Sequence, residues 1–204
     1  ALECSATDAN ILWVGGVNVW KSTNGGTNWA CNAHWTGSGG LPYVHADVHC
    51  LSWIPANNSL YVGCDGGVFR TTNNGTSYSD ISSNLQISQQ YRLGIAELNA
   101  NKILTGWQDN GSNLKNGTAH SQVLGGDGME CIIARTNENV MYGEIYYGAI
   151  YKSTNNGGTF NPIVNSGGTG VNADGAWVTP YAMGATDNDL YVGKSTIYKS
   201  SNAG

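Results

Sequence analysis

The chain of 204 residues is 40% hydrophobic and 10% aromatic, so it can bury a core, and its formal net charge is −5. Charged residues make up only 11% of it, against roughly 25% in an average soluble domain. The acidic balance argues against nucleic acid or an anionic membrane surface as a partner. No apolar run approaches the ~20 residues that are needed to span a bilayer.

Glycine, with 29 residues, and turns rich in Asn, Ser and Thr take the place of the missing charges. No stretch shows a sustained helical period, so the composition predicts an all-β fold with many short strands. A β-rich surface with few charges and many Asn, Thr and Gly residues is commoner in secreted proteins, where disulfides also persist. We therefore expect an extracellular or cell-surface protein.

A short phrase closes the first group of predicted strands and then returns along the chain. Each copy has a hydroxyl residue, Asn two positions later and Gly two positions after that, and the first three copies place an aromatic residue three positions beyond the Gly. The copies are STNGGTNW at 22–29, TTNNGTSY at 71–78, STNNGGTF at 153–160 and SSNAG at 200–204. Asn bonds its own backbone and Gly adopts a positive φ without steric cost, so each copy predicts a hairpin turn between two strands.

The spacing of the copies indicates the architecture. They begin 49, 82 and 47 residues apart, and the long step is close to two short ones, so one unit lacks the phrase. A period in the forties with four strands per unit is typical of a propeller blade. We expect one β-propeller domain, or a fragment of one, with about five blades over 1–204. The approximate blades are 1–40, 41–87, 88–124, 125–170 and 171–204.

Two of these units are unusual. The third has predicted first and second strands at 91–98 and 102–106, and carries GWQDNGSNLKNG where the phrase should be. The fifth stops before a fourth strand. Because propellers close their ring, we expect a further part of the chain, or another chain, to complete the last blade, and we favour the view that 1–204 is a piece of a longer protein.

The repeated phrase resembles the Asp-box, or BNR, repeat of sialidase-like and sortilin-like β-propellers, with Asn in place of the usual Asp. The order HADVH, GCDGGVFRT, GWQDNG, GGDGME, WVTP and YKSSNAG also resembles large secreted BNR-repeat proteins of Bacteroidota that are often labelled glycosyl hydrolases. The similar propellers of glycoside hydrolase family 74 place an Asp pair in a cleft between two propellers. The resemblance therefore implies a propeller with glycan-related activity.

Cys4, Cys50 and Cys131 occupy the same place in the predicted first strands of their blades. The expected reason is that this position is buried and has room only for a small side chain. We predict that Cys4 and Cys131 are buried and reduced. Around the turn at 55–59, Cys50 and Cys64 come opposite each other, so a Cys50–Cys64 bridge is a hypothesis for an oxidising compartment.

Loops between second and third strands share a face with the segments that lead into first strands, opposite the repeated turns. This geometry gathers several acidic and His side chains on one face. Three interpretations remain open: each Asp stabilises its own turn, His45, Asp47 and His49 bind calcium or a transition metal, or a carboxylate pair hydrolyses glycosides. The catalytic candidates are Asp65, Asp109 and Asp127.

Aromatic side chains that follow second strands lie near the same face and could stack on sugar rings: Trp107, Tyr146 and Tyr147. Their alternative role is packing between blades. The leading hypothesis is a propeller that binds a polysaccharide or a surface protein without turning it over. The alternatives are a glycoside hydrolase of β-glucan or xyloglucan type that uses paired Asp residues, and a structural module of a surface or fibrous assembly.

Overall fold

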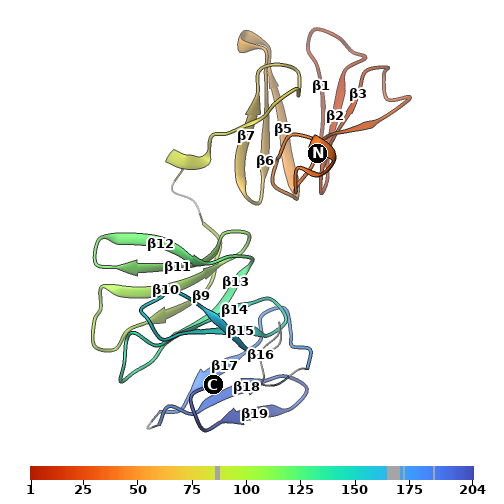
Figure 1. Ribbon diagram of the computed structural model, residues 1–204. Coiled ribbons are helices and arrows are strands. Elements are labelled where there is room, and N and C mark those ends of the chain that lie inside the picture. Colours follow the sequence, from red (N-terminus) through yellow and green to blue (C-terminus); the bar gives the residue numbers. More distant parts are fainter. Residues whose placement is uncertain (86–87, 165–170, 172, 186) are drawn as a thin grey trace. The chain divides into compact units, whose positions relative to one another are not determined.

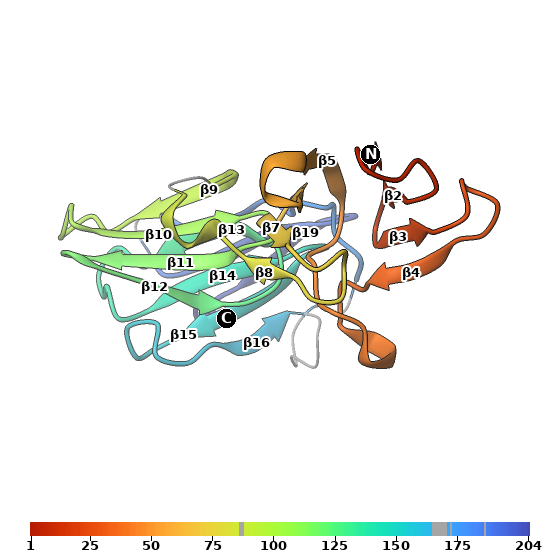
Figure 2. The same ribbon diagram turned by 90° about the horizontal axis from the view of Figure 1, so that it is seen from above.

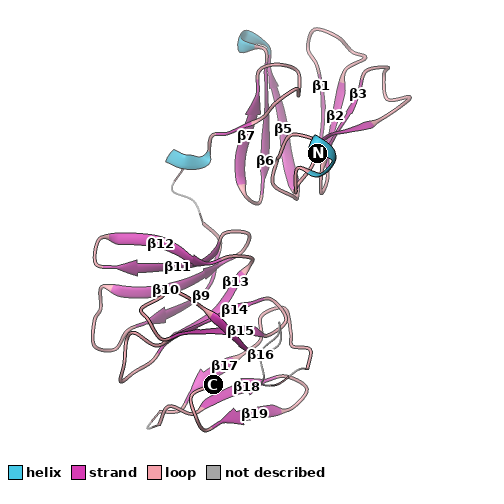
Figure 3. Ribbon diagram, viewed as in Figure 1, coloured by secondary structure: helices cyan, strands magenta, loops and turns pink. Residues whose placement is uncertain are grey.

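The computed structural model describes residues 1–85, 88–164, 171, 173–185 and 187–204 (Figure 1). Its regular secondary structure is almost entirely β-strand (Figure 3), and the described residues also form three single-turn 3₁₀ helices, η1 (Ser38–Gly40), η2 (Pro55–Asn57) and η3 (Ser82–Asn84). Within the described residues, no helix has the length and apolarity that a membrane crossing requires. The chain forms two compact units, Ala1–Gln86 and Ile87–Gly204.

The N-terminal unit contains two antiparallel four-stranded sheets whose strands follow each other in chain order. The first sheet consists of β1 (Leu2–Cys4), β2 (Leu12–Gly15), β3 (Val19–Ser22) and β4 (Ala30–Ala33). The second consists of β5 (Val48–Ile54), β6 (Ser59–Cys64), β7 (Gly67–Thr71) and β8 (Ser79–Asp80).

The C-terminal unit contains three sheets of the same meander topology. The third sheet of the chain, with its strands side by side in Figure 2, consists of β9 (Gln90–Ile95), β10 (Lys102–Trp107), β11 (Gly111–Asn116) and β12 (Ala119–Leu124). The fourth consists of β13 (Gly128–Ile133), β14 (Met141–Ile145), β15 (Ala149–Ser153) and β16 (Asn161–Val164). The fifth, in the described residues, consists of β17 (Tyr181–Met183), β18 (Leu190–Gly193) and β19 (Ile197–Ser200).

These sheets confirm the predicted fold class: all-β, with β-propeller blades of four antiparallel strands and an incomplete fifth blade. The unit without the repeated phrase is a complete blade. One detail differs from expectation, because GWQDNGSNLKNG does not replace the missing turn. It covers the last two residues of β10, the loop between β10 and β11, and then β11 itself. The two-residue loop of Gly117 and Thr118 joins the third strand to the fourth. That the whole chain is one propeller domain stays a prediction.

Each repeated turn is held by the same hydrogen bonds. In the fourth blade, the buried Ser153 hydroxyl donates to Asn155 Oδ1 at 3.0 Å and accepts the amide of Gly157 at 3.0 Å. Asn155 Oδ1 also accepts the Thr159 amide at 2.9 Å. The other copies make the matching hydroxyl bonds to Asn and Gly, from Ser22, Thr71 and Ser200. One hydroxyl and one amide oxygen therefore satisfy the polar groups of a tight loop.

The repeated turns also tie neighbouring blades together. Lys21, next to the hydroxyl residue of the first turn, donates through Nζ to the Asn74 carbonyl in the second turn at 2.8 Å. Lys152 makes the same contact with the Ala203 carbonyl at 2.7 Å. Apolar clusters fill the spaces between sheets within each unit, around Trp13 and Trp53 in the first unit and around Leu104 and Ile150 in the second. This packing is what positions the loops at the opposite blade ends.

The cysteine predictions were partly wrong. All five cysteines carry free thiols. Cys131 is buried as predicted, but Cys4 is exposed, because it ends a strand of three residues at the margin of its sheet. Cys50 lies opposite Gly63 rather than Cys64, which pairs with Val48. The hairpin closes at Ile54 and Ser59, and this one-residue change of register moves the two thiols out of line.

Candidate functional site

Three exposed aromatic rings lie together in the C-terminal unit. Tyr146 and Tyr147 belong to the loop between β14 and β15, and Trp177 lies in the segment that leads into β17. The rings of Tyr146 and Trp177 are stacked with centroids 5.4 Å apart and an interplanar angle of 4°. Tyr147 stands edge-on to both, 5.6 Å from Tyr146 and 5.3 Å from Trp177. We call these three rings the aromatic platform; they are 41%, 52% and 38% exposed in sequence order.

Hydrogen bonds join the platform to the third blade. Trp177 Nε1 donates to the Tyr91 hydroxyl at 3.2 Å, and that hydroxyl donates to Gln108 Oε1 at 2.6 Å. Gln89 Nε2 donates to the same oxygen at 3.1 Å. Gln108 lies in the loop between β10 and β11, Gln89 lies just before β9, and Trp177 lies before β17. A loop between second and third strands therefore meets two segments that lead into first strands, as the blade geometry predicts. The result is an apolar surface with polar groups at one border.

A buried carboxylate lies beneath the platform. Glu144, on β14, is fully buried, and its Oε1 accepts the amides of Gly148 at 3.1 Å and Thr179 at 2.8 Å. Its Oε2 accepts the Glu130 amide at 3.3 Å. Burial raises the pKa of Glu144 to about 7, against the opposing effect of these amide bonds. Burial likewise raises the pKa of the Glu130 carboxyl, which the nearby Arg92 guanidinium opposes.

Two of the three predicted catalytic acids come together. Asp127 Oδ1 accepts the backbone amide of Asp109 at 2.7 Å, and Asp109 has a left-handed backbone with φ 59°. The Asp127 carboxylate thus holds the turn that Asp109 occupies, which favours the turn-stabilising interpretation for this residue. Asp65 belongs to the N-terminal unit, where its Oδ1 lies 2.5 Å from His49 Nε2.

The predicted metal ligands all lie in the N-terminal unit. The His45 ring packs over Gly66, where an added Cβ would be 2.3 Å from His45 Cγ. Asp47 has a left-handed backbone with φ 61°, and His49 faces Asp65. In the part of the chain that the structure describes, no three His, Cys, Asp or Glu side chains are grouped as an ion site. Calcium or transition-metal binding by His45, Asp47 and His49 stays a prediction.

The predicted binding residues divide into two groups. Tyr146 and Tyr147 form the platform, whereas the Trp107 ring lies against His120 in β12, with centroids 5.5 Å apart. Sequence reasoning did not single out Trp177 or Glu144. Trp177 had a usable signal, since an aromatic residue shortly before a first strand reaches the same face as the loop at 146–147. Glu144 had none beyond a charge within an apolar strand.

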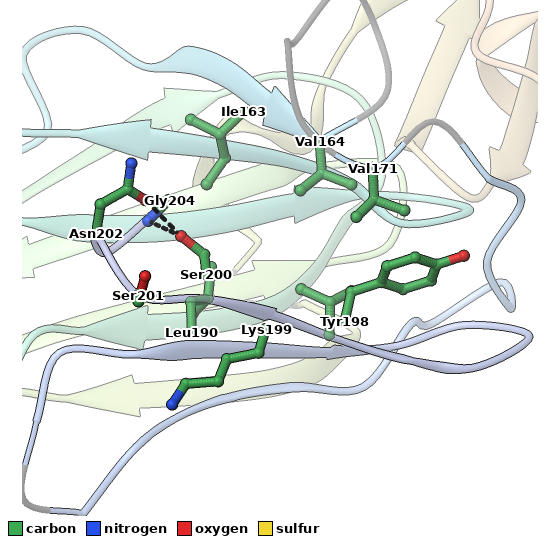
Figure 4. Close-up of a pocket in the computed structure, with 11 residues that line it drawn as sticks. Ile163, Val164, Val171, Leu190, Tyr198, Lys199, Ser200, Ser201, Asn202 and Gly204 are labelled. Atoms are coloured by element: carbon green, nitrogen blue, oxygen red, sulfur yellow. Dashed lines mark hydrogen bonds between the residues drawn. The ribbon is translucent and has the colours of Figure 1, made fainter.

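A second feature is a groove of about 650 Å³ beside the incomplete blade. Figure 4 shows Ile163 and Val164 of β16 on one side and Leu190 and Tyr198 of the fifth sheet on the other. In the second and fourth blades, the aromatic residue after the turn packs against the preceding blade. Tyr78 donates its hydroxyl to Asn32 Oδ1 in β4 at 2.7 Å, and Phe160 packs against the cluster around Leu104.

No protein-family model matches the chain, and no curated protein is similar to it. Similar solved structures include the GH74 xyloglucanase from Xanthomonas campestris, with 14% identity and a TM-score of 0.46 over 99% of this chain and 36% of that one. The GH74 enzyme of Niastella koreensis has 16% identity and a TM-score of 0.44 over 97% and 35%. YCF48 from Cyanidioschyzon merolae has 11% identity and a TM-score of 0.39 over 93% and 65%. The chain thus spans about a third of the length of these two GH74 structures.

Proposed function

We propose that this chain is part of a secreted or cell-surface β-propeller that binds a polysaccharide through its aromatic platform and does not cleave it. The platform is the observation that carries the proposal. Three large rings remain exposed while their neighbours are fixed by hydrogen bonds, so they offer apolar area at little cost in conformational entropy. Gln89, Gln108 and Tyr91 supply polar groups at one border, as a glycan site needs.

We also propose that the repeated turns are Asp-box repeats. The recurring hydroxyl–Asn–Gly turns support assignment as Asp-boxes with Asn in place of Asp, because the Asn oxygen accepts the loop amide that a carboxylate would accept. The low charge and the turn-rich surface support an extracellular location. A surface protein as the partner is the alternative ligand for the same platform.

Glycoside hydrolysis is the competing function. It needs one carboxyl as acid and another as base or nucleophile on either side of the scissile bond. The bond from the Asp109 amide to Asp127 favours a structural role for Asp127.

Replacing Trp177 by Ala is expected to weaken glycan binding by at least about tenfold, because it removes one ring of the stacked pair and the anchor to Tyr91. A glycan array finds the ligand, and isothermal titration gives the affinities. Trp35→Ala is the matched control, since Trp35 is 49% exposed in the N-terminal unit. Equal loss in both variants contradicts the proposal. A reducing-sugar assay runs in parallel, and release that disappears in Asp65→Asn or Asp127→Asn would establish the hydrolase instead.

The groove supports a second candidate function, that of a structural module. We propose that a fourth strand, from a further part of the chain or from another chain, pairs with β19 and places an aromatic side chain in the groove. A fluorescent peptide with the sequence of residues 158–164 is expected to bind, and its Phe160→Ala version is expected to bind at least about tenfold more weakly. Equal affinity of the two peptides contradicts this assignment.

A further inference from the structure

Glu144 occupies an unusual place relative to the platform. Its carboxylate is fully buried near the end of β14, two residues before Tyr146. A buried carboxylate is costly unless its oxygens accept several hydrogen bonds. Here three backbone amides donate to the carboxylate, and the Thr179 side chain also interacts with it, so the chain is arranged around this side chain.

One oxygen of Glu144 joins the two segments that carry the platform. Oε1 accepts from Gly148, which follows Tyr147, and from Thr179, which comes two residues after Trp177. Two backbone bonds connect the same segments: the Tyr147 amide to the Trp177 carbonyl at 3.3 Å and the Gly175 amide to the Tyr147 carbonyl at 3.2 Å. These two bonds lie near the surface, whereas both amide bonds to Glu144 are buried.

Building on the proposed function, we propose that Glu144 is the positioning residue of the platform. Its Oε1 holds the 146–148 loop and the 177–179 segment in the one arrangement that stacks Trp177 on Tyr146, and this arrangement sets the affinity for ligand. Without that shared acceptor, the Gly148 and Thr179 amides lose their buried partner. The segments then separate to reach water, and the stacked pair opens.

The proposal predicts a pH dependence with a definite sign. In the closed arrangement burial raises the pKa of Glu144 to about 7, and in an opened one the hydrated carboxyl returns toward its ordinary value of 4.5. The closed state therefore binds the proton more tightly, so the stabilisation is fully present below about pH 4.5 and is lost as the pH rises through about 7. A neutral carboxyl still accepts both platform amides through Oε1.

Other titratable groups surround this carboxyl. Glu130 and Cys131 lie on β13, Tyr181 lies on β17, and Lys194 follows β18 with Asp174 nearby. Lys194 Nζ donates to the Gly148 carbonyl at 3.3 Å, and burial lowers its pKa. Burial raises the pKa of the Cys131 thiol and the Tyr181 hydroxyl above their ordinary values. Glu130, whose carboxyl pKa is raised, is therefore the group whose titration must be separated from that of Glu144.

The test measures hydrogen exchange in the full chain, corrected for the intrinsic rate, in peptides that cover 145–149 and 176–180. In the wild type, protection is expected to fall on the order of tenfold between about pH 5.5 and about pH 8.5. Glu144→Gln keeps the Oε1 acceptor and cannot ionise, so it should retain protection and lose the pH dependence. Glu144→Leu should lose about tenfold or more of the protection at both pH values. Glu130→Gln is the control and should behave as the wild type.

Retention of the wild-type pH profile in Glu144→Gln overturns the proposal, and so does full protection in Glu144→Leu. If Glu144→Leu does not fold, the profile of Glu144→Gln still decides. The affinity for hydroxyethyl cellulose, a soluble β-glucan, is measured in the same series by affinity electrophoresis. If hydrogen exchange follows the expected pattern but no glycan binding is found, the proposed function is contradicted. The role of Glu144 in positioning the platform then still stands. Binding that weakens with rising pH in the wild type, and not in Glu144→Gln, supports both.

Discussion

Replacing Gly106 by Ala is expected to destabilise the C-terminal unit by about 3 kcal/mol or more. An added Cβ at Gly106 would lie 1.9 Å from the Met129 carbonyl oxygen and 2.7 Å from the Gly128 carbonyl carbon. Both contacts are with backbone of the neighbouring blade, which has no rotamer to change. Because β10 and β13 must separate to admit the methyl group, the packing between the third and fourth blades is weakened where these strands meet.

Gly125→Ala is the matched control for this substitution. Gly125 lies in the same unit, is exposed, and has nothing within 4 Å of an added Cβ. Its change in the free energy of unfolding should stay within about 0.5 kcal/mol. Urea unfolding of the full chain measures both variants, and hydrogen exchange in β5 and β6 of the other unit serves as an internal reference. A Gly106→Ala protein as stable as the wild type would show that the blades do not approach each other as closely as described.

The propeller blades were predictable because their signal is repeated. Four turns with one spacing, each held by local hydrogen bonds, do not depend on distant parts of the chain. The third blade was predictable even without the turn, since its first two strands have clear β patterns. Its turn was misplaced, because a two-residue Gly117–Thr118 loop leaves much less sequence signal than an eight-residue phrase.

The candidate site was less predictable, for a physical reason. Tyr146 and Tyr147 were found because they follow a strand, but Trp177 comes near them only through the packing of the fourth and fifth blades. The function of Glu144 depends on amides at Gly148 and Thr179, and backbone amides carry no sequence signal. The Cys50–Cys64 prediction was wrong for a related reason, since one residue of register in a hairpin decides which side chains face each other.

Ser153→Ala is expected to lower the free energy of unfolding by about 2–3 kcal/mol. The Ser153 hydroxyl is completely buried; it donates to Asn155 Oδ1 and accepts the amides of Asn155 and Gly157. Alanine leaves the buried Gly157 amide without its partner and also removes the two part-buried bonds to Asn155. Ser153→Thr should cost only about 0.5 kcal/mol, because Thr71 makes the same bonds in the second blade.

Ser200→Ala completes the comparison. Ser200 makes equivalent bonds to Asn202 at 2.6 Å and Gly204 at 2.8 Å, but these are exposed. Water can replace the lost hydroxyl there, so the cost should be about 1 kcal/mol or less. Urea unfolding gives all three values. A cost at Ser200 equal to that at Ser153 would mean that the hydrogen bonds themselves, rather than the burial of their partners, determine the stability of these turns.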